Sequence, residues 1–497
     1  MYLVIDVGTT QARSCLVDRQ GSIVAIEYVP LITCCPHPGW VEQNPILVYQ
    51  ALKDTTNRLL DRKSNEGAIT ALALTNQRNS VVVWNKKTGD PVYPAIVWQD
   101  RREWKLVHEL MEDSLREELL HKCGIVARSA TTISKLRWIL DMVPGVRERA
   151  EAGELIGGTI DSWLLWKLTS GRLHATDYSN AAITGLFNLR TLCWDKELLE
   201  RLRIPTTMLA NEVKPSAEFY DHTSLESIGI EVPIAAVAGD QHAAMLGYGC
   251  VSAGQAQATI GTGTFLLINT GEKPMFSSRG LSSRVGFGTP QTTHYVLEGT
   301  IPHSGTAIEF LVEMGILTSA TESESLAYSI PDAADVYFVP AFTGLGTPRW
   351  NDKVKGTIGG LSRGTKRAHI VRACLEAIGY QVQDVFCVLK EEFNLPIEVL
   401  RVGGGVAKNN FAVQFLSDIT GIEVHRAATS ETTVLGGALL AGLTQGHIRG
   451  LDEVSSRFKA DRIFRPNIDP HRREMLYRSW CQAVNRIISE GHTNPTA

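Results

Sequence analysis

Two glycine turns about 250 residues apart carry residue types that suit phosphate. The first reads Asp6-Val7-Gly8-Thr9-Thr10 and is soon followed by Arg13, and the second reads Gly261-Thr262-Gly263-Thr264. Small residues between two strands expose successive backbone N–H groups, and threonine hydroxyls add donors for phosphate oxygens. The Asp6 carboxylate suits Mg²⁺, bound directly or through water, and Arg13 suits neutralisation of phosphate charge. Either turn alone is also compatible with an ordinary hairpin, but the pair indicates a site that clamps a triphosphate.

A carboxylate and a third glycine segment extend this set. Asp240 follows the apolar run "PIAAVAG" and precedes small residues that begin a helix. It suits a general base for a substrate hydroxyl and also the N-cap of that helix, and the two roles do not exclude each other. Residues 402–410, "VGGGVAKNN", end a strand in three glycines. Glycines permit close approach of the backbone to a flat ligand such as adenine, and the alternative is a flexible strand–helix loop.

A run of polar residues interrupts two apolar strands. Thr75-Asn76-Gln77-Arg78-Asn79 lies between "ALAL" and "VVVW". Buried polar groups are costly unless they are hydrogen-bonded. This run is therefore either a surface turn or the floor of a site that hydrogen-bonds a polar ligand.

The segments that position these residues repeat along the chain. Residues 1–30 have the pattern of three strands joined by tight turns, and a helical pattern follows over 44–62. Residues 254–301 again show a strand, a glycine turn and further strands, with a helix expected over 305–314. This repetition predicts an internal duplication that forms two lobes with a cleft between them. The last third alternates helices with strands, which is typical of an α/β fold. Its helices are expected over 367–392, 409–420, 432–446 and 470–488.

Length and composition exclude several classes of protein. A chain of 497 residues is expected to form two large domains. The net charge of −4 gives no footprint for nucleic acid or for an anionic membrane. Nine cysteines without a CxxC pair predict reduced thiols in a cytosolic protein. The longest apolar run, 434–443, is too short to cross a bilayer, and no signal peptide is visible at the N-terminus. We therefore expect a cytoplasmic protein.

Taken in order, these motifs resemble the FGGY carbohydrate kinases, a family within the superfamily of actin, hexokinase and the heat-shock ATPases. The resemblance runs nearly end to end, through "HPGWVEQNP" (37–45), "TNQR" (75–78), "GDQHAA" (239–244), "GTGTF" (261–265) and "VPAFTGLGTPRW" (339–350). It implies an α/β fold of two actin-like (ribonuclease H-like) lobes from internal duplication, with an ATP cleft between them. Residues 1–247 would form the N-terminal lobe on the acceptor side, and residues 248–497 the C-terminal lobe on the nucleotide side.

The resemblance also implies roles for single residues. Asp240 would be the general base, and Asp6 would organise Mg²⁺ together with Asp240. The acceptor, a small polyol or sugar, would contact Arg78, Asn79, Trp98, Gln241 and Phe265. ATP would contact Gly8, Thr9, Thr10, Arg13, Gly261, Thr262, Gly263, Gly404, Gly405 and Asn409. Relatives are often dimers or tetramers, so a homodimer or homotetramer is implied as well.

Two departures leave the acceptor open. Within the family, the members that phosphorylate glycerol are the most similar, but they usually carry a glutamate where this chain has Asn79 and a tyrosine where it has Ala130. Glycerol is the first expectation, and a four- or five-carbon polyol or ketose is the alternative, because an amide and a methyl group leave a larger pocket. A non-catalytic actin-like ATP-binding protein is the alternative from another class. Glu231 replaces an arginine of the fructose 1,6-bisphosphate loop, so inhibition by that anion is not expected.

Overall fold

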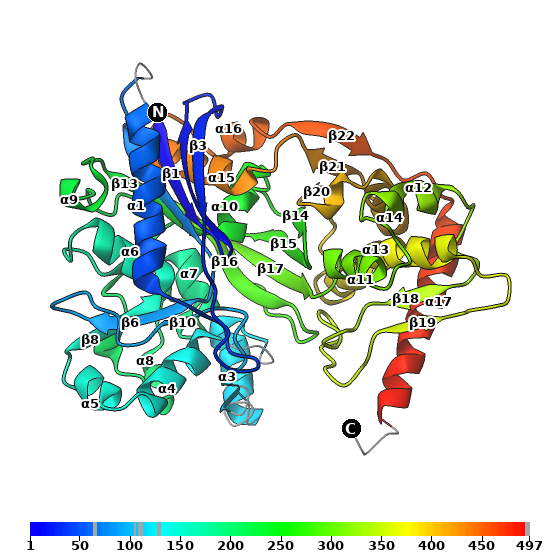
Figure 1. Cartoon of the computed structure of the whole chain (residues 1–497), viewed down its shortest axis with the longest axis horizontal. Helices are drawn as coiled ribbons and strands as arrows, with labels where there is room; N and C mark the ends of the chain where they lie inside the picture. The colour runs from blue at the N-terminus through cyan, green and yellow to red at the C-terminus, as the bar shows by residue number, and fades with distance from the viewer. Residues whose placement is uncertain (63–66, 104–105, 108–112, 127–130, 493–497) are drawn as a thin grey trace.

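The computed structural model describes residues 1–62, 67–103, 106–107, 113–126 and 131–492, and these form two lobes that lie side by side (Figure 1). The N-terminal lobe is built on a five-stranded sheet with the order β3-β2-β1-β5-β13. β1 pairs antiparallel with β2 and β2 with β3, whereas β1, β5 and β13 run parallel. The strands are β1 (Tyr2–Val7), β2 (Gln11–Val17), β3 (Ile23–Pro30), β5 (Ala71–Asn76) and β13 (Ile234–Gly239).

The C-terminal lobe repeats this arrangement. Within its seven-stranded sheet, the order β17-β15-β14-β20-β21 has two antiparallel pairings followed by two parallel ones, as in the first sheet. The duplication predicted from the repeated strand pattern is therefore confirmed. β16 and β22 extend the two edges. The strands are β14 (Gln255–Ile260), β15 (Thr264–Gly271), β16 (Ser282–Gly288), β17 (Thr293–Ile301), β20 (Val399–Gly403), β21 (Val424–Ala427) and β22 (Ala460–Phe464).

A long insertion follows β5 in the N-terminal lobe. Three of its strands form a four-stranded sheet with β4, which precedes β5 in the chain; the order is β4-β7-β6-β8, and helices cover the sheet on the lower left of Figure 1. Its sheet and main helices are β4 (Glu42–Gln43), β6 (Val81–Asn85), β7 (Ala95–Ile96), β8 (Leu155–Thr159), α3 (Asp113–Cys123), α4 (Thr132–Met142), α5 (Val146–Glu151) and α6 (Ile160–Leu168). Shorter elements lead on to β13: β9 (Ala175–Asp177), α7 (Tyr178–Ile183), β10 (Phe187–Asn188), β11 (Cys193–Trp194), α8 (Lys196–Arg201), β12 (Glu212–Lys214) and α9 (Leu225–Ile228).

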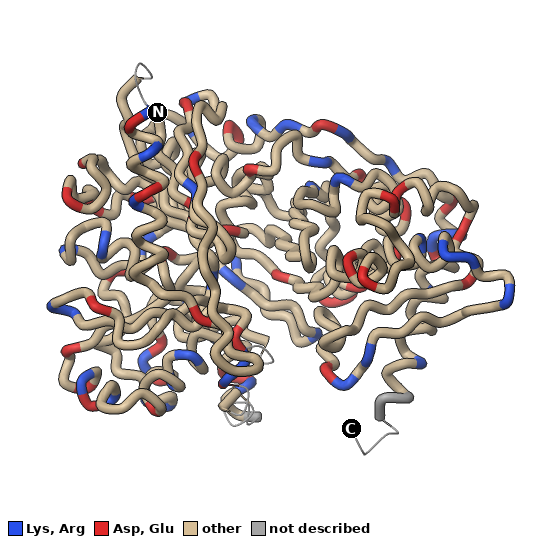
Figure 2. Tube along the Cα trace, viewed as in Figure 1, with Lys and Arg blue, Asp and Glu red and all other residues tan. Residues whose placement is uncertain are grey.

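The helices predicted over 44–62, 305–314, 367–392, 409–420, 432–446 and 470–488 are present to within a few residues, whereas the short helices over 322–328 and 451–456 were not predicted. α1 (Pro45–Arg62) packs on β2 and β3, and α13 (Arg367–Phe393) packs on α14. Charged residues of both signs alternate along the trace of both lobes (Figure 2). The other elements are α10 (Asp240–Gly247), α11 (Gly305–Glu313), α12 (Glu322–Tyr328), α14 (Asn410–Thr420), α15 (Thr432–Thr444), α16 (Leu451–Ser456), α17 (Pro470–His492), β18 (Tyr337–Val339) and β19 (Thr357–Gly359).

Helix α15 joins the two halves of the chain. It packs on β1, β5 and β13 of the first sheet and along α10. A Cβ atom at Gly436 would overlap the Ala243 carbonyl, so the two helices touch through their backbones. The residues of α15 and of the first sheet share one hydrophobic core, which includes Val4, Ala73 and Val434. None of the described helices combines the length and the apolar character needed to cross a bilayer.

Candidate active site

The first glycine turn lies beside a buried carboxylate–arginine pair. Asp6 and Arg13 are opposite each other in the β1–β2 register. Thr75 Oγ1 donates to Asp6 Oδ1 at 2.8 Å, and Arg13 Nε donates to Asp6 Oδ2 at 3.0 Å. Arg13 Nη1 also donates to Glu431 Oε2, at 2.5 Å, just before α15. Burial opposes the charge of Arg13, but Asp6 and Glu431 outweigh it and raise the pKa of the guanidinium. Arg13 is therefore held between two carboxylates.

The polar run after β5 is not a surface turn. Residues 75–78 are all buried, and most of their side chains serve the fold. Asn76 exchanges two hydrogen bonds with Asn180, at 2.9 and 3.0 Å. Gln77 donates to Gln43 Oε1 at 2.8 Å, which fixes the loop near the first glycine turn. The last part of the run, Arg78 and Asn79, contains the candidates for contact with a ligand.

Asn79 has a backbone conformation that explains its residue type. Its φ angle is +64°, in the left-handed region, where asparagine is several-fold enriched. Its Oδ1 accepts a hydrogen bond from Thr132 Oγ1 at 2.7 Å, at the first turn of α4. The amide is thus tied to the insertion. Ala130, the other predicted departure from the family pattern, lies outside the described residues.

Arg78 is a charged group that links the two lobes. Its Nη2 atom is 2.7 Å from Glu298 Oε1 on β17, whereas its Nε atom is 3.4 Å from Asp240 Oδ1. The guanidinium carbon lies 5.8 Å from the centre of the Phe265 ring. Among the described residues, Arg78 Nη1 and Gln241 Oε1 are both buried without a hydrogen-bond partner. A donor and an acceptor that lack partners are suited to a ligand hydroxyl, which can satisfy both.

Asp240 is the first residue of α10. The N-cap of this helix is Gly239, so the prediction that Asp240 might cap it is wrong: the side chain instead accepts from the Gln241 N–H at 2.7 Å. Burial raises the pKa of Asp240 to about 6; Arg78 opposes this effect and Asp6 adds to it. A carboxylate with a pKa near neutrality can take up a proton during a reaction at physiological pH.

An aromatic pair connects the two glycine turns. Trp98, from the N-terminal lobe, donates its Nε1 hydrogen to Thr9 Oγ1 at 2.8 Å. Its ring meets the Phe265 ring edge to face, with 6.2 Å between the centres. Phe265 is near the start of β15, directly after Gly261–Gly263. The first turn, Trp98, Phe265 and the second turn therefore follow one another across the space between the lobes.

The second and third glycine segments lie against each other. Gly404 has a φ of +92°, and a Cβ atom there would lie 2.5 Å from the Ile260 carbonyl oxygen, next to the second turn. At Gly405, by contrast, a Cβ would point into open space. Asn409 caps α14 through Ala412 N at 3.0 Å and donates to Ser323 Oγ at 3.1 Å, so its amide already has structural partners.

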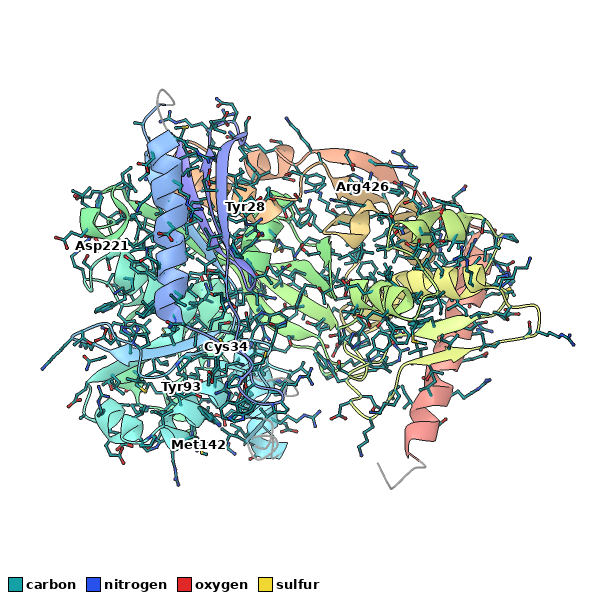
Figure 3. All side chains as sticks on the ribbon, in the orientation of Figure 1. Tyr28, Cys34, Tyr93, Met142, Asp221 and Arg426 are labelled. Carbon is teal, nitrogen blue, oxygen red and sulfur yellow. The ribbon has the colours of Figure 1, made fainter. Side chains whose placement is uncertain are left out.

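Arg426 steadies this third segment from the neighbouring strand. It is labelled near β21 in Figure 3. Its Nη1 atom donates to the Ala407 carbonyl at 3.2 Å and to Asn410 Oδ1 at 3.1 Å. The loop that follows the three glycines is therefore held from two sides, by α14 and by Arg426.

Two residues of this site were not predicted from the sequence. Glu298 is a buried carboxylate in the otherwise apolar strand "HYVLEGTI", and that contrast is the signal that could have revealed it. Burial alone would raise the pKa of Glu298, but Arg78 and Arg284 lower it to about 2. Burial lowers the pKa of Arg284 to about 10, although Glu298 opposes this. Glu431, the second residue, is the partner of Arg13 described above.

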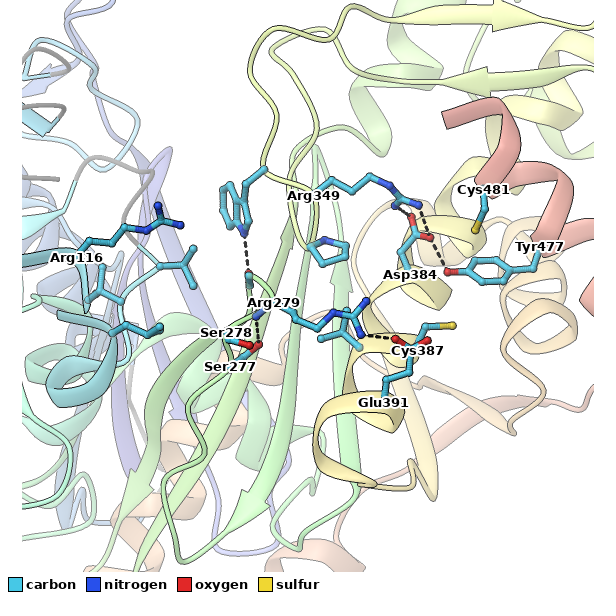
Figure 4. A pocket seen from close by; sticks show the side chains of 17 residues that line it. Arg116, Ser277, Ser278, Arg279, Arg349, Asp384, Cys387, Glu391, Tyr477 and Cys481 are labelled. Carbon is cyan, nitrogen blue, oxygen red and sulfur yellow. Dashed lines mark hydrogen bonds and ion pairs between the residues drawn. The ribbon is translucent and has the colours of Figure 1, made fainter. Parts of the chain in front are cut away.

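In two other clusters of charged residues, carboxylates are already paired with cationic side chains of the protein. A cavity of about 550 Å³ lies between α3 and the helices α13 and α17 (Figure 4). In its wall Asp384 accepts from Arg349 and from Tyr477, and Arg279 pairs with Glu391. Elsewhere three carboxylates surround the ammonium group of Lys122, which occupies the place that a metal ion would take; they belong to Glu118, Asp195 and Glu197.

Comparisons with known proteins agree with this architecture. The model for the FGGY family of carbohydrate kinases, N-terminal domain, matches residues 1–247, and the C-terminal domain model matches residues 256–444. The chain is 44% identical to a glycerol kinase of Petrotoga mobilis, over 97% of both chains. It is 43% identical to glycerol kinase 2 of Thermotoga maritima, over 98% of both.

Solved structures show the same fold. A Plasmodium falciparum glycerol kinase with ADP superposes with a TM-score of 0.92 at 32% identity, over 98% of both chains. A xylulose kinase from Lactobacillus acidophilus superposes with a TM-score of 0.89 at 21% identity, over 98% of this chain and 99% of that one. These likenesses confirm the predicted fold of two actin-like α/β lobes. The chain belongs to the FGGY family of carbohydrate kinases.

Proposed function

We propose that this protein transfers the γ-phosphoryl group of ATP to a hydroxyl of a small polyol, with glycerol as the first candidate. The observation that carries the proposal is that two residues next to Asp240 have buried, unpartnered atoms: Arg78 Nη1, on the side chain that contacts Asp240, and Gln241 Oε1, on the residue that follows it. An acceptor hydroxyl bound to them would lie next to a carboxylate able to take its proton. The glycerol kinases at 43–44% identity support the same acceptor.

The residues divide the work between the lobes. Asp240 accepts the proton of the attacking hydroxyl. The rings of Trp98 and Phe265 line the acceptor pocket and shield the acceptor from water. The turns Gly8–Thr10 and Gly261–Gly263 hold the phosphates with backbone N–H groups. Gly404 and Gly405 let the adenosine approach the backbone. Phosphoryl transfer passes through a loose transition state, so alignment and charge neutralisation supply most of the catalysis.

The carboxylates near the first turn fit a bound Mg²⁺ ion. Magnesium prefers oxygen ligands and usually keeps several of its waters. Both oxygens of Asp6 already accept hydrogen bonds from Thr75 and Arg13, so Asp6 fits a contact through water. Asp240 offers a second carboxylate across from it. When bound, the ion would neutralise charge on the phosphates.

A larger acceptor is the second candidate, and Asn79 favours it. Its side-chain oxygen is held by Thr132 at 2.7 Å, and an amide provides no carboxylate to bind polyol hydroxyls. Losing one charge-assisted hydrogen bond costs on the order of 1.5–3 kcal/mol, or about ten- to hundred-fold in affinity. A four- or five-carbon polyol or ketose would recover this energy through additional contacts.

The decisive experiment is a coupled ADP-release assay over a panel of acceptors. The panel contains glycerol, dihydroxyacetone, tetritols, pentitols and ketopentoses, each with ATP and Mg²⁺, and a blank without acceptor. We expect at least one acceptor to raise the rate far above the blank, and the kcat/KM ranking to choose between glycerol and the larger compounds. ATP binding with no acceptor-dependent turnover would instead favour the non-catalytic actin-like alternative.

A further inference from the structure

Glu298 reaches the acceptor arginine from the opposite lobe. It lies on β17 of the C-terminal lobe, whereas Arg78 belongs to the loop between β5 and β6 of the N-terminal lobe. Both side chains are buried, with 7% and 8% of their surfaces exposed, and their ion pair is 2.7 Å long. The pair therefore joins the two lobes inside the site, away from solvent.

The two carboxylates near Arg78 are not used equally. Glu298 Oε1 lies 2.7 Å from the terminal nitrogen Nη2 of Arg78. Asp240 Oδ1 instead lies 3.4 Å from Nε of the same guanidinium. Arginine and a carboxylate prefer two parallel hydrogen bonds of about 2.7–2.9 Å. Asp240 is close enough to form such a pair with Arg78 in place of Glu298, but its contact with the guanidinium is longer than a paired hydrogen bond. The shorter contact with Glu298 is consistent with a guanidinium whose fork points away from Asp240.

The walls around Arg78 allow little other freedom. A Cβ atom at Gly239 would lie 2.7 Å from Arg78 Cγ, so the arginine stem lies directly against the backbone before α10. The Phe265 ring stands 5.8 Å from the guanidinium carbon on another side. With the stem fixed, rotation of the guanidinium between Glu298 and Asp240 is the main movement left.

The charges in this cluster balance only when all its members are present. Arg284 on β16 is the second cation beside Glu298, with its Nε atom 3.6 Å from Glu298 Oε2. Arg78 and Arg284 together carry two positive charges, and Glu298 and Asp240 carry two negative ones. Removing Glu298 leaves Asp240 as the one described carboxylate in contact with Arg78. An incompletely paired buried charge moves toward the partner that remains.

We propose that Glu298 is a positioning residue for the acceptor: it holds Arg78 away from Asp240, which keeps Arg78 Nη1 available to an acceptor hydroxyl and Asp240 available as the base. The inference rests on the proposed function of Arg78 and Asp240. It adds a residue of the C-terminal lobe to the acceptor site, and it makes the geometry of that site depend on contact between the lobes.

A graded series of variants tests the proposal kinetically. Glu298→Met removes the hydrogen-bond acceptor at similar volume, and Glu298→Gln keeps the acceptor but removes the charge. We expect the KM of the best acceptor to rise about ten- to hundred-fold in Glu298→Met, with a smaller rise in Glu298→Gln. The KM of ATP should stay within about two-fold, because the nucleotide contacts are elsewhere.

A buried glutamate far from the site provides the matched control. Glu376 on α13 is also buried and pairs with Arg372 at 2.8 Å. Glu376→Met should lower thermal stability and leave the acceptor KM within about two-fold. If Glu298→Met likewise loses only stability, Glu298 is merely structural and the proposal is overturned.

A crystal structure of ligand-free Glu298→Met tests the geometry without any assay. We expect the Arg78 guanidinium to turn to Asp240 and form two hydrogen bonds with it; an unmoved Arg78 refutes the proposal. Should the single variant fail to fold, Glu298→Met/Arg284→Met removes one charge of each sign and permits the same measurement. If the wild-type protein phosphorylates nothing in the acceptor panel, the proposed function fails, while this structure still decides whether Glu298 positions Arg78.

Discussion

The raised pKa of Asp240 leads to a direct prediction about the pH dependence of the reaction. Burial raises this pKa from 3.8 to about 6, with a further contribution from Asp6 and against the effect of Arg78. The unprotonated carboxylate is the form that can accept a proton. Its fraction is about nine-tenths at pH 7, about half at pH 6 and about one-tenth at pH 5. Acceptor kcat/KM should therefore fall about five-fold between pH 6 and pH 5.

The sign of the stability effect separates this loss of activity from acid unfolding. A carboxyl group whose pKa is higher in the folded protein than in the unfolded chain binds its proton more tightly when folded. Protonation of Asp240 therefore favours the folded state as the pH falls from about 6 to about 4. Loss of activity in this window should accordingly occur without unfolding caused by this group.

The assay is a pH series of initial rates from pH 5 to 8.5, at saturating ATP and Mg²⁺ and at acceptor concentrations below KM. Under these conditions kcat/KM for the acceptor reports the ionisation of the enzyme–ATP complex before the acceptor binds. Circular dichroism and ADP binding at each pH serve as controls for folding and for the nucleotide site. An activity that stays constant down to pH 5 would show that the carboxylate acting as base has an ordinary pKa, and it would refute the reasoning.

Four further predictions concern single groups. Asp240→Asn should lower kcat by about 10²–10⁴-fold and leave the Kd of ADP, measured by calorimetry, near normal; more than a few per cent of residual activity would remove Asp240 as the base. Asn79→Glu combined with Ala130→Tyr should raise kcat/KM for glycerol in the coupled assay, although glutamate in the left-handed conformation should lower the free energy of unfolding by about 1–2 kcal/mol. Gly404→Ala should lower the free energy of unfolding by about 1–3 kcal/mol, whereas Gly405→Ala, where a Cβ meets open space, should change it by less than about 1 kcal/mol. Fructose 1,6-bisphosphate at physiological concentration should leave the initial rate unchanged, and clear inhibition would contradict that expectation.

The local signals predicted the repeated sheets well but missed their edges. Tight turns at Gly8–Thr10 and Gly261–Gly263 mark the meanders, because glycine-containing clusters of small residues between apolar runs favour turns. β16 was not predicted, because "SSRVGFG" carries serines and glycines that are typical of loops. Its strand depends on pairing with β17, a neighbour along the sheet that no local pattern identifies. Strands as short as β4 and β7 likewise exist only through their partners.

The site was predictable where one segment carries the chemistry and not where two segments meet. Arg78 and Asp240 stand in recognisable motifs, so both were found in the sequence. Glu298 and Glu431 each belong to the site through a contact with a residue more than 200 positions away, Arg78 or Arg13. Such contacts follow from the packing of the lobes, and propensity and periodicity contain no information about them. The polar run at 75–79 shows the same limit, because three of its side chains turned out to support the fold.

The two arginines that face the site are prepared for their ligands in different ways. Each is held by a carboxylate from the second half of the chain, because a buried guanidinium needs a counter-charge before any ligand arrives. Arg78 nevertheless keeps Nη1 without a partner among the described residues, so an acceptor hydroxyl can bind it without breaking an ion pair. Arg13 instead uses Nε, Nη1 and Nη2 on Asp6 and Glu431. A phosphate that reaches Arg13 can use the second hydrogens of Nη1 and Nη2, but it then lies beside the Glu431 carboxylate, which couples the phosphate side of the cleft to the start of α15 and leaves the acceptor side preformed.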